Sequence, residues 1–76
     1  MSMQNLDLKK LVGERLKDSR KAAGFTQTEI AKKLGMTQQQ YSRFENGVFE
    51  LNYSQLVFLA REYDISVDYL LGLIEF

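Results

Sequence analysis

The chain has 76 residues, of which 45% are hydrophobic and 26% charged, and its ten basic and ten acidic side chains give a formal net charge of zero. This length and composition are typical of a small folded domain, so residues 1–76 are predicted to form one domain with its core at about 12–73 and residues 1–7 flexible. The absence of cysteine and histidine excludes a disulfide scaffold, a thiolate zinc site and the commonest general base, so we expect neither an enzyme nor a metal or other cofactor.

Helical periodicity and capping signals divide the chain into five predicted helices. The first has apolar residues at helical spacing between Leu8 and Ala23 and ends at Gly24, because glycine adopts the left-handed conformation readily. The second begins after Thr26, whose hydroxyl caps the helix while Glu29 reaches back to it, and it ends at residue 35.

The remaining helices have the same kind of boundaries. Thr37 caps the third helix, with Gln40 three residues further on, and Asn46-Gly47 ends it. Asn52 caps the fourth helix and Ser66 caps a short fifth one. The chain contains no proline and no alternating segment of strand type, so the predicted fold class is all-α with five helices.

The second and third predicted helices are separated only by residues 35–37. A short turn that contains glycine makes two helices cross steeply, which is the geometry of a helix-turn-helix unit. Ala31 is small where the two helices approach each other. The apolar side chains that are predicted to face inward together are Ile30, Leu34, Met36, Tyr41 and Phe44.

The outer surface of the third helix carries Gln38, Gln39 and Gln40, followed by Ser42 and Arg43. Glutamine donates and accepts hydrogen bonds at once and matches the N6/N7 edge of adenine, while arginine matches O6/N7 of guanine. Three glutamines alone are also compatible with a solvated surface. Their position on the helix that follows a glycine turn favours the reading of DNA bases.

Charge is divided unevenly along the chain. Residues 1–43 contain nine basic and four acidic side chains, whereas residues 44–76 contain one basic and six acidic side chains. This asymmetry indicates an electrostatic binding face, and chance segregation of charge is the alternative. Glu62, Asp64 and Asp68 lie near predicted helix ends and are interpreted as solvated residues rather than as a metal or acid–base site.

Three segments carry a family resemblance: GFTQTEIA at 24–31, LGMT at 34–37 and YSRFENG at 41–47. They resemble the helix-turn-helix domain of the Cro and phage-repressor type, often called the XRE family, over residues 12–73. The resemblance implies a lambda-repressor-like fold of five helices whose third helix enters the major groove of double-stranded DNA. It also implies a transcriptional regulator, of the repressor kind, that binds an inverted repeat as a homodimer.

The resemblance implies roles for individual residues. Gln38, Gln39 and Arg43 match base-reading positions, with Gln40 and Ser42 flanking them. Phosphate contacts are expected from Thr26, Gln27, Thr37, Asn46 and Gly47, and unpaired amides at a helix start independently favour phosphate at Thr26 and Gln27. Arg20 and Glu45 match an internal salt bridge, which would explain an acid beside the DNA; a DNA-facing Arg20 is the alternative.

The segment after Gly47 departs from the family pattern. Where the family commonly has basic residues and then proline, residues 48–51 read VFEL, so a positive phosphate clamp is missing. Val48, Phe49 and Phe58 are predicted to be either additional core or an exposed patch for a partner. The apolar tail 73–76 is predicted to dock on its own domain or on a second copy. Phe58, Leu73, Ile74 and Phe76, on the fourth and fifth helices and the tail, mark the expected homodimer surface.

Two classes of function remain after these observations. The first is a sequence-specific DNA-binding transcriptional regulator. The alternative is a protein-interaction module, or an antitoxin-type partner protein, with weak or lost DNA binding; the acidic second half favours it. No apolar stretch approaches the roughly 20 residues that cross a bilayer, and residues 1–10 have no apolar core of the signal-peptide type, so we expect a cytoplasmic location and no membrane partner.

Overall fold

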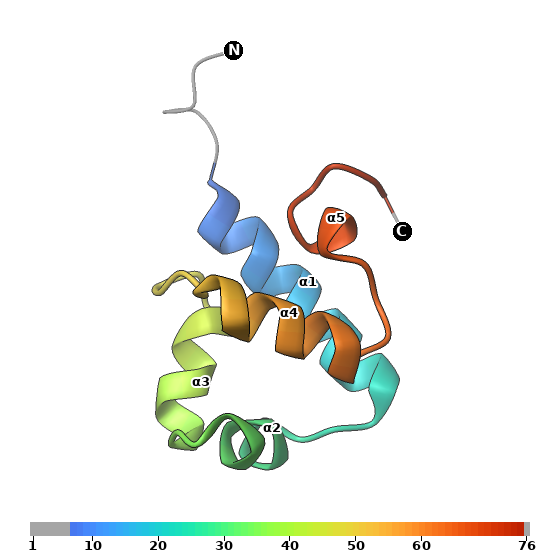
Figure 1. The fold of residues 1–76 in the computed structure, drawn as a ribbon. Helices are drawn as coiled ribbons and strands as arrows, with labels where there is room; N and C mark the ends of the chain where they lie inside the picture. The colour runs from blue at the N-terminus through green and yellow to red at the C-terminus, as the bar shows by residue number, and fades with distance from the viewer. Residues whose placement is uncertain (1–6, 76) are drawn as a thin grey trace.

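The computed structural model describes residues 7–75, and within them the chain forms five helices and no strand (Figure 1). The helices are α1 (Leu8–Ala23), α2 (Gln27–Leu34), α3 (Gln38–Glu45), α4 (Tyr53–Glu62) and α5 (Val67–Leu70). The predicted all-α fold with five helices is therefore confirmed. Of the segment predicted to be flexible, residues 1–6 lie outside the described residues, while Asp7 caps α1 by accepting a hydrogen bond from the Lys10 amide (3.2 Å).

The helices α2 to α5 begin after the predicted capping residues. Capping boxes, in which the cap and the third helical residue satisfy each other's backbone amides, open α2, α3 and α4 at Thr26, Thr37 and Asn52. Gly24 and Gly35 end α1 and α2 with φ of 83° and 71°. Because a Cβ is unfavourable in this left-handed region, glycine fixes where these two helices stop.

All five helices contribute to one core. Its buried hydrophobic residues are Leu16, Ile30, Ala31, Tyr41, Phe44, Leu59, Ala60, Tyr63 and Leu70. Phe58 packs partly buried against this core, so it is not the free surface residue that a dimer face would need. Val48 and Phe49 are 55% and 47% exposed, so they agree with the prediction of an exposed patch rather than of additional core.

The C-terminal segment lies against α1. The Arg15 guanidinium donates hydrogen bonds to the carbonyls of Tyr69 and Ile74 (2.7 Å to the latter), and its central carbon lies 4.4 Å from the centre of the Tyr69 ring. The Glu75 carboxylate lies 3.9 Å from the same guanidinium. The tail therefore docks on its own domain, while Leu73 and Ile74 stay 72% and 43% exposed.

The helix-turn-helix unit and the C-terminal segment lie at opposite ends of the molecule. In Figure 1, α2 and α3 lie at one end, α5 and the C-terminal segment lie at the other, and α4 crosses α1 between them. In the part of the chain that the structure describes, no helix is both long and apolar enough to cross a membrane.

Candidate nucleic-acid interface

A tight turn at residues 35–37 joins α2 to α3. Gly35 has φ 71° and ψ 32°, the Met36 amide donates to the Ala31 carbonyl (2.9 Å), and Thr37 opens α3. Ala31 and Tyr41 are fully buried at this junction. Since Ala31 carries only a methyl group, the two helices approach closely, and they form the predicted helix-turn-helix unit.

The outer surface of α3 exposes Gln38, Gln39, Gln40 and Arg43, with Ser42 half-buried. Two of these side chains also have local partners. The Gln40 amide oxygen accepts a hydrogen bond from the Thr37 backbone amide (2.9 Å), and the Ser42 hydroxyl accepts one from the Asn46 side chain (3.2 Å). Gln38, Gln39 and Arg43 are the exposed side chains of α3 that make no hydrogen bond within the helix or at its ends, while Gln40 completes the capping box with Thr37.

A chain of hydrogen bonds links α1, α2 and α3. The Arg20 guanidinium donates to Glu45 through Nε (2.7 Å to Oε2) and Nη2 (3.2 Å to Oε1), and Nη1 donates to the Phe25 carbonyl (2.8 Å). The Gln27 side chain donates to the same Glu45 carboxylate (2.9 Å) and accepts a hydrogen bond from the Gln38 side chain (2.5 Å). This network holds both ends of α3 on the other two helices.

The ion pair at the centre of this network is buried. Arg20 is 8% exposed and Glu45 is 5% exposed. Burial alone raises the pKa of the Glu45 carboxyl, but hydrogen bonds, led by the one from Arg20, outweigh it and hold that pKa below its ordinary value. The bond to Glu45 likewise raises the pKa of Arg20. Arg20 is therefore directed into the protein and is not a DNA-facing charge.

Gly13 allows α1 to lie against the end of α3, and the sequence analysis missed it. A Cβ built on Gly13 would lie 2.4 Å from the Glu45 carbonyl oxygen and 2.7 Å from that of Phe44, closer than real contacts allow. A glycine inside an apolar helical pattern is costly for the helix, so its presence between Val12 and Leu16 was the available signal of a close packing contact.

The backbone amides of the loop after α3 are bonded within the protein. Those of Asn46 and Gly47, two residues at which phosphate contacts are predicted, donate to the carbonyls of Ser42 (2.9 Å) and Phe44 (3.2 Å). The carbonyls at a helix end need such donors, so the helix end itself takes these amides. A phosphate contact at this loop is left to the exposed Asn46 side chain.

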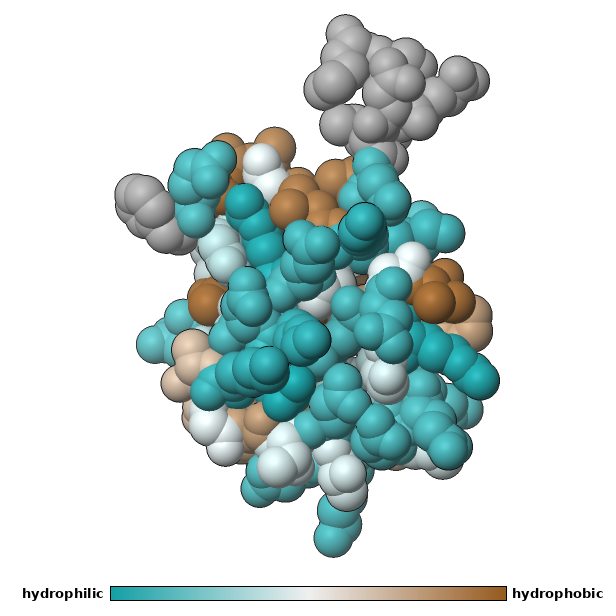
Figure 2. Space-filling view, turned by 180° about the vertical axis from the view of Figure 1, so that it is seen from behind, coloured by the Kyte–Doolittle hydropathy of each residue, from teal (hydrophilic) through white to brown (hydrophobic). Residues whose placement is uncertain are grey.

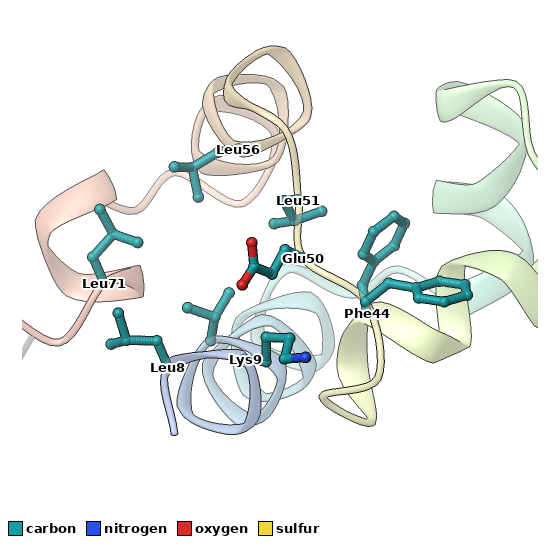
Figure 3. Close-up of a pocket in the computed structure, with 9 residues that line it drawn as sticks. Leu8, Lys9, Phe44, Glu50, Leu51, Leu56 and Leu71 are labelled. Carbon is teal, nitrogen blue, oxygen red and sulfur yellow. The ribbon is translucent and has the colours of Figure 1, made fainter. Parts of the chain in front are cut away.

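A cavity of about 190 Å³ lies between α1, Phe44 of α3, residues 49–51, α4 and Leu71, which follows α5. Figure 3 shows Leu8, Leu56 and Leu71 facing this space, with Lys9 and Glu50 supplying the polar atoms. The Glu50 side chain projects from the loop toward Leu8 and away from Phe44. The acid that the sequence places after α3 is thus directed away from that helix.

Not all basic residues of the first half are available to a ligand. Arg20 is buried, Arg15 holds the C-terminal segment, and Lys33 lies 2.8 Å from Glu62 on α4. The remaining basic residues of residues 1–43 are exposed: Lys9, Lys10, Lys17, Lys21, Lys32 and Arg43. The charge asymmetry of the sequence therefore overstates the positive surface. Within residues 7–75, no cluster of carboxylates or other metal ligands could hold a metal ion.

The crossing of α2 and α3, with α3 held on α1, defines a small helix-turn-helix domain. A family model described as helix-turn-helix matches residues 16–70. The chain belongs to this family, in its XRE-type form, so the resemblance found in the sequence is confirmed. Membership of this family agrees with the expectation that the protein is not an enzyme.

Several proteins of Bacillus subtilis (strain 168) are similar to this chain. The uncharacterized HTH-type transcriptional regulator YobD is 42% identical over 60 residues, which are 79% of this chain and 54% of YobD. The HTH-type transcriptional regulator ImmR is 39% identical over 61 residues, 80% of this chain and 48% of ImmR. The uncharacterized HTH-type transcriptional regulator YqaE is 39% identical over 61 residues, 80% of this chain and 53% of YqaE. The chain thus spans about half the length of these relatives.

Proposed function

We propose that this protein is a sequence-specific transcriptional regulator, a repressor, that reads the major groove of double-stranded DNA with α3. The observation that carries the proposal is the outer surface of α3, which exposes Gln38, Gln39 and Arg43 on the second helix of a helix-turn-helix unit. The names of YobD and ImmR, both called transcriptional regulators, support the same class of function.

The exposed groups on α3 have the chemistry of base recognition. Gln38 and Gln39 pair a donor with an acceptor, as the major-groove edge of adenine requires, and Arg43 offers two parallel donors for guanine. Gln40 and Ser42 flank this set. The Gln38 amide is held by Gln27, which restricts the orientations in which it meets a base.

Phosphate groups would be bound at the helix starts. The backbone amide of Thr26 already donates to the Glu29 carboxylate (2.8 Å), and that of Thr37 donates to Gln40 (2.9 Å). A phosphate at the start of α2 or α3 would therefore bind the backbone amides of the first two helical residues, which for α2 begin at Gln27. The exposed hydroxyl of the capping threonine would lie beside it. These contacts position the protein on DNA without reading sequence.

The protein would bind as a homodimer on an inverted repeat. One α3 reads about four or five base pairs, and two-fold pairing repeats the readout about 34 Å away, one turn of DNA. Figure 2 shows hydrophobic side chains gathered mainly toward the upper part of the molecule, the end that carries α5 and the tail in Figure 1. Leu73 and Ile74 are exposed there, and Val57 is exposed on α4.

Pairing is tested by comparing a full inverted repeat with a single half-site. Deletion of residues 73–76 should weaken binding to the full repeat while leaving binding to the half-site unchanged, because α3 is untouched. Wild type that binds both duplexes equally, with one protein per duplex, would contradict the dimer.

Base reading is tested by selecting bound sequences from a random duplex pool and titrating variants on the selected site. Gln38→Ala, Gln39→Ala and Arg43→Ala should each cost about 1–3 kcal/mol of specific binding. Tyr53→Ala, a control on α4 whose side chain is 89% exposed, should bind as wild type does. If all three α3 variants bind the site as tightly as wild type, α3 is not the reading helix.

A protein-interaction module on the same fold is the second candidate. The loop at residues 48–51 favours it, because the loop carries no cation and exposes Val48 and Phe49. A salt titration on random duplex DNA separates the two candidates. DNA binding through phosphates weakens steeply as salt rises, whereas an interaction module shows little affinity at any salt concentration.

A further inference from the structure

The loop after α3 places an aromatic ring against an exposed arginine of that helix. The centre of the Phe49 ring lies 5.6 Å from the guanidinium carbon of Arg43. The same ring packs edge-on against Phe44, with 6.3 Å between the ring centres and 66° between the planes. Phe44 belongs to the core and is 8% exposed, whereas Phe49 is 47% exposed. Phe49 thus connects a fixed core residue to a side chain on the proposed DNA-reading surface.

The backbone keeps Phe49 in this place. The amides of Val48 and Phe49 both donate to the Arg43 carbonyl, at 2.9 Å and 3.3 Å. Gly47 turns the chain with φ 74°, and a Cβ at Gly47 would lie 2.9 Å from the Lys10 Cα. The loop therefore folds back onto the residue whose side chain Phe49 contacts, and α1 supports it from behind.

A free arginine on a helix surface loses much rotamer freedom when it binds a base. A guanidinium within about 6 Å of an aromatic ring is attracted to the ring, so part of this freedom is already lost in the unbound protein. Ordering a side chain before binding lowers the cost of the contact that it makes. The ring carries no charge and leaves the guanidinium edge free for hydrogen bonds.

We infer that Phe49 is a positioning residue for Arg43: its ring orients the guanidinium before DNA is bound and so sharpens the preference for one base pair. The inference rests on the proposed function, because it needs Arg43 to read a base. Phe49 acts through Arg43 and not through phosphate. Its loss should therefore change the base preference at one position of the site rather than the affinity for all DNA.

The test compares sequences that wild type and variants select from a random duplex pool. Arg43→Ala first identifies the position whose preference depends on Arg43. Phe49→Leu, which keeps an apolar side chain against Phe44 but removes the aromatic face, should lower the preference at that position by about two- to five-fold, the equivalent of about 0.5–1 kcal/mol for an exposed cation–π contact. Phe49→Tyr should retain the preference, and Val48→Ala is the matched control on the same loop.

Two further measurements separate positioning from folding and from the proposed function. Phe49→Leu loses an edge-on aromatic contact with Phe44, so its melting temperature should fall by several degrees at most, and circular dichroism should show it fully folded at the assay temperature. The double variant Arg43→Ala/Phe49→Leu should be no less selective than Arg43→Ala alone. An unchanged preference in Phe49→Leu, or a uniform loss over all positions, would overturn the inference while base reading stands. If Arg43→Ala changes the base preference at no position, the proposal that Arg43 reads a base is wrong, and the proposed role of Phe49 is wrong with it.

Discussion

Replacing Arg20 by alanine tests how α3 is held on the domain. Three guanidinium nitrogens of Arg20 donate to Glu45 and to the Phe25 carbonyl. Arg20→Ala leaves the Glu45 carboxylate, which is 5% exposed, without its cation. Removing one partner of a buried pair costs about 3–5 kcal/mol. For a domain of this size each kcal/mol lowers the melting temperature by about 4–8 °C, so the melting temperature should fall by about 12 °C or more.

The same variant has a characteristic pH dependence. In wild type the pKa of Glu45 lies below its ordinary 4.5, so the stability due to the pair is present above pH 4.5 and is lost as the pH falls through the depressed pKa. In Arg20→Ala burial still raises the pKa of Glu45 while the largest opposing hydrogen bond is lost, so that pKa should be higher than in wild type and protonation in acid should relieve part of the penalty. The difference in melting temperature between variant and wild type should therefore shrink on acidification.

Thermal unfolding followed by circular dichroism at neutral and acidic pH measures both effects. Lys21→Ala is the matched control, because Lys21 is the next residue on α1 and its side chain is exposed. Equal melting temperatures for Arg20→Ala and Lys21→Ala would refute the reasoning. A large difference that stays the same at every pH would refute the part that depends on Glu45.

The remaining predictions concern packing, titration and the tail. Gly13→Ala places a methyl group 2.4 Å from the Glu45 carbonyl oxygen, so urea denaturation should show a loss of about 1–3 kcal/mol, with none in exposed Lys17→Ala. Burial raises the pKa of Tyr63 from 10.0 to about 12. The stability that comes from keeping this phenol neutral is therefore complete below pH 10 and should be lost as the pH rises toward 12, which urea denaturation at several pH values in this range measures. Arg15→Ala should speed amide hydrogen exchange in residues 71–75 and leave exchange in the core unchanged.

The helices and their ends could be predicted because their signals are local. Thr26 and Thr37 bond to residues three positions away, so each capping box is visible in four consecutive letters. Gly24 and Gly35 stop α1 and α2 for a reason that also belongs to one residue, its left-handed conformation. The placement of α3 on α1 depends on Gly13, whose contact lies 32 positions away in the sequence at Glu45, and no local pattern encodes it.

The candidate site divides in the same way. The exposure of Gln38, Gln39 and Arg43 follows from helical periodicity and was predictable. The acceptor that each backbone amide finds was not predictable: the amides of residues 46 and 47 donate to carbonyls of α3. The contact between Phe49 and Arg43 was also out of reach, because it depends on a loop conformation that Gly47 permits but does not specify.

The contacts described above restrain either the position of α3 or the orientation of its side chains. The Arg20–Glu45 pair fixes where the helix lies, and its loss should lower stability and binding together. Gln27 and Phe49 instead contact the Gln38 and Arg43 side chains and bias how these meet a base. Gln27 contributes to both the position of α3 and the orientation of its side chains, since it also donates a hydrogen bond to Glu45. A substitution at Gln27 therefore mixes the two effects, whereas Arg20 and Phe49 separate the holding of the helix from the orientation of its side chains.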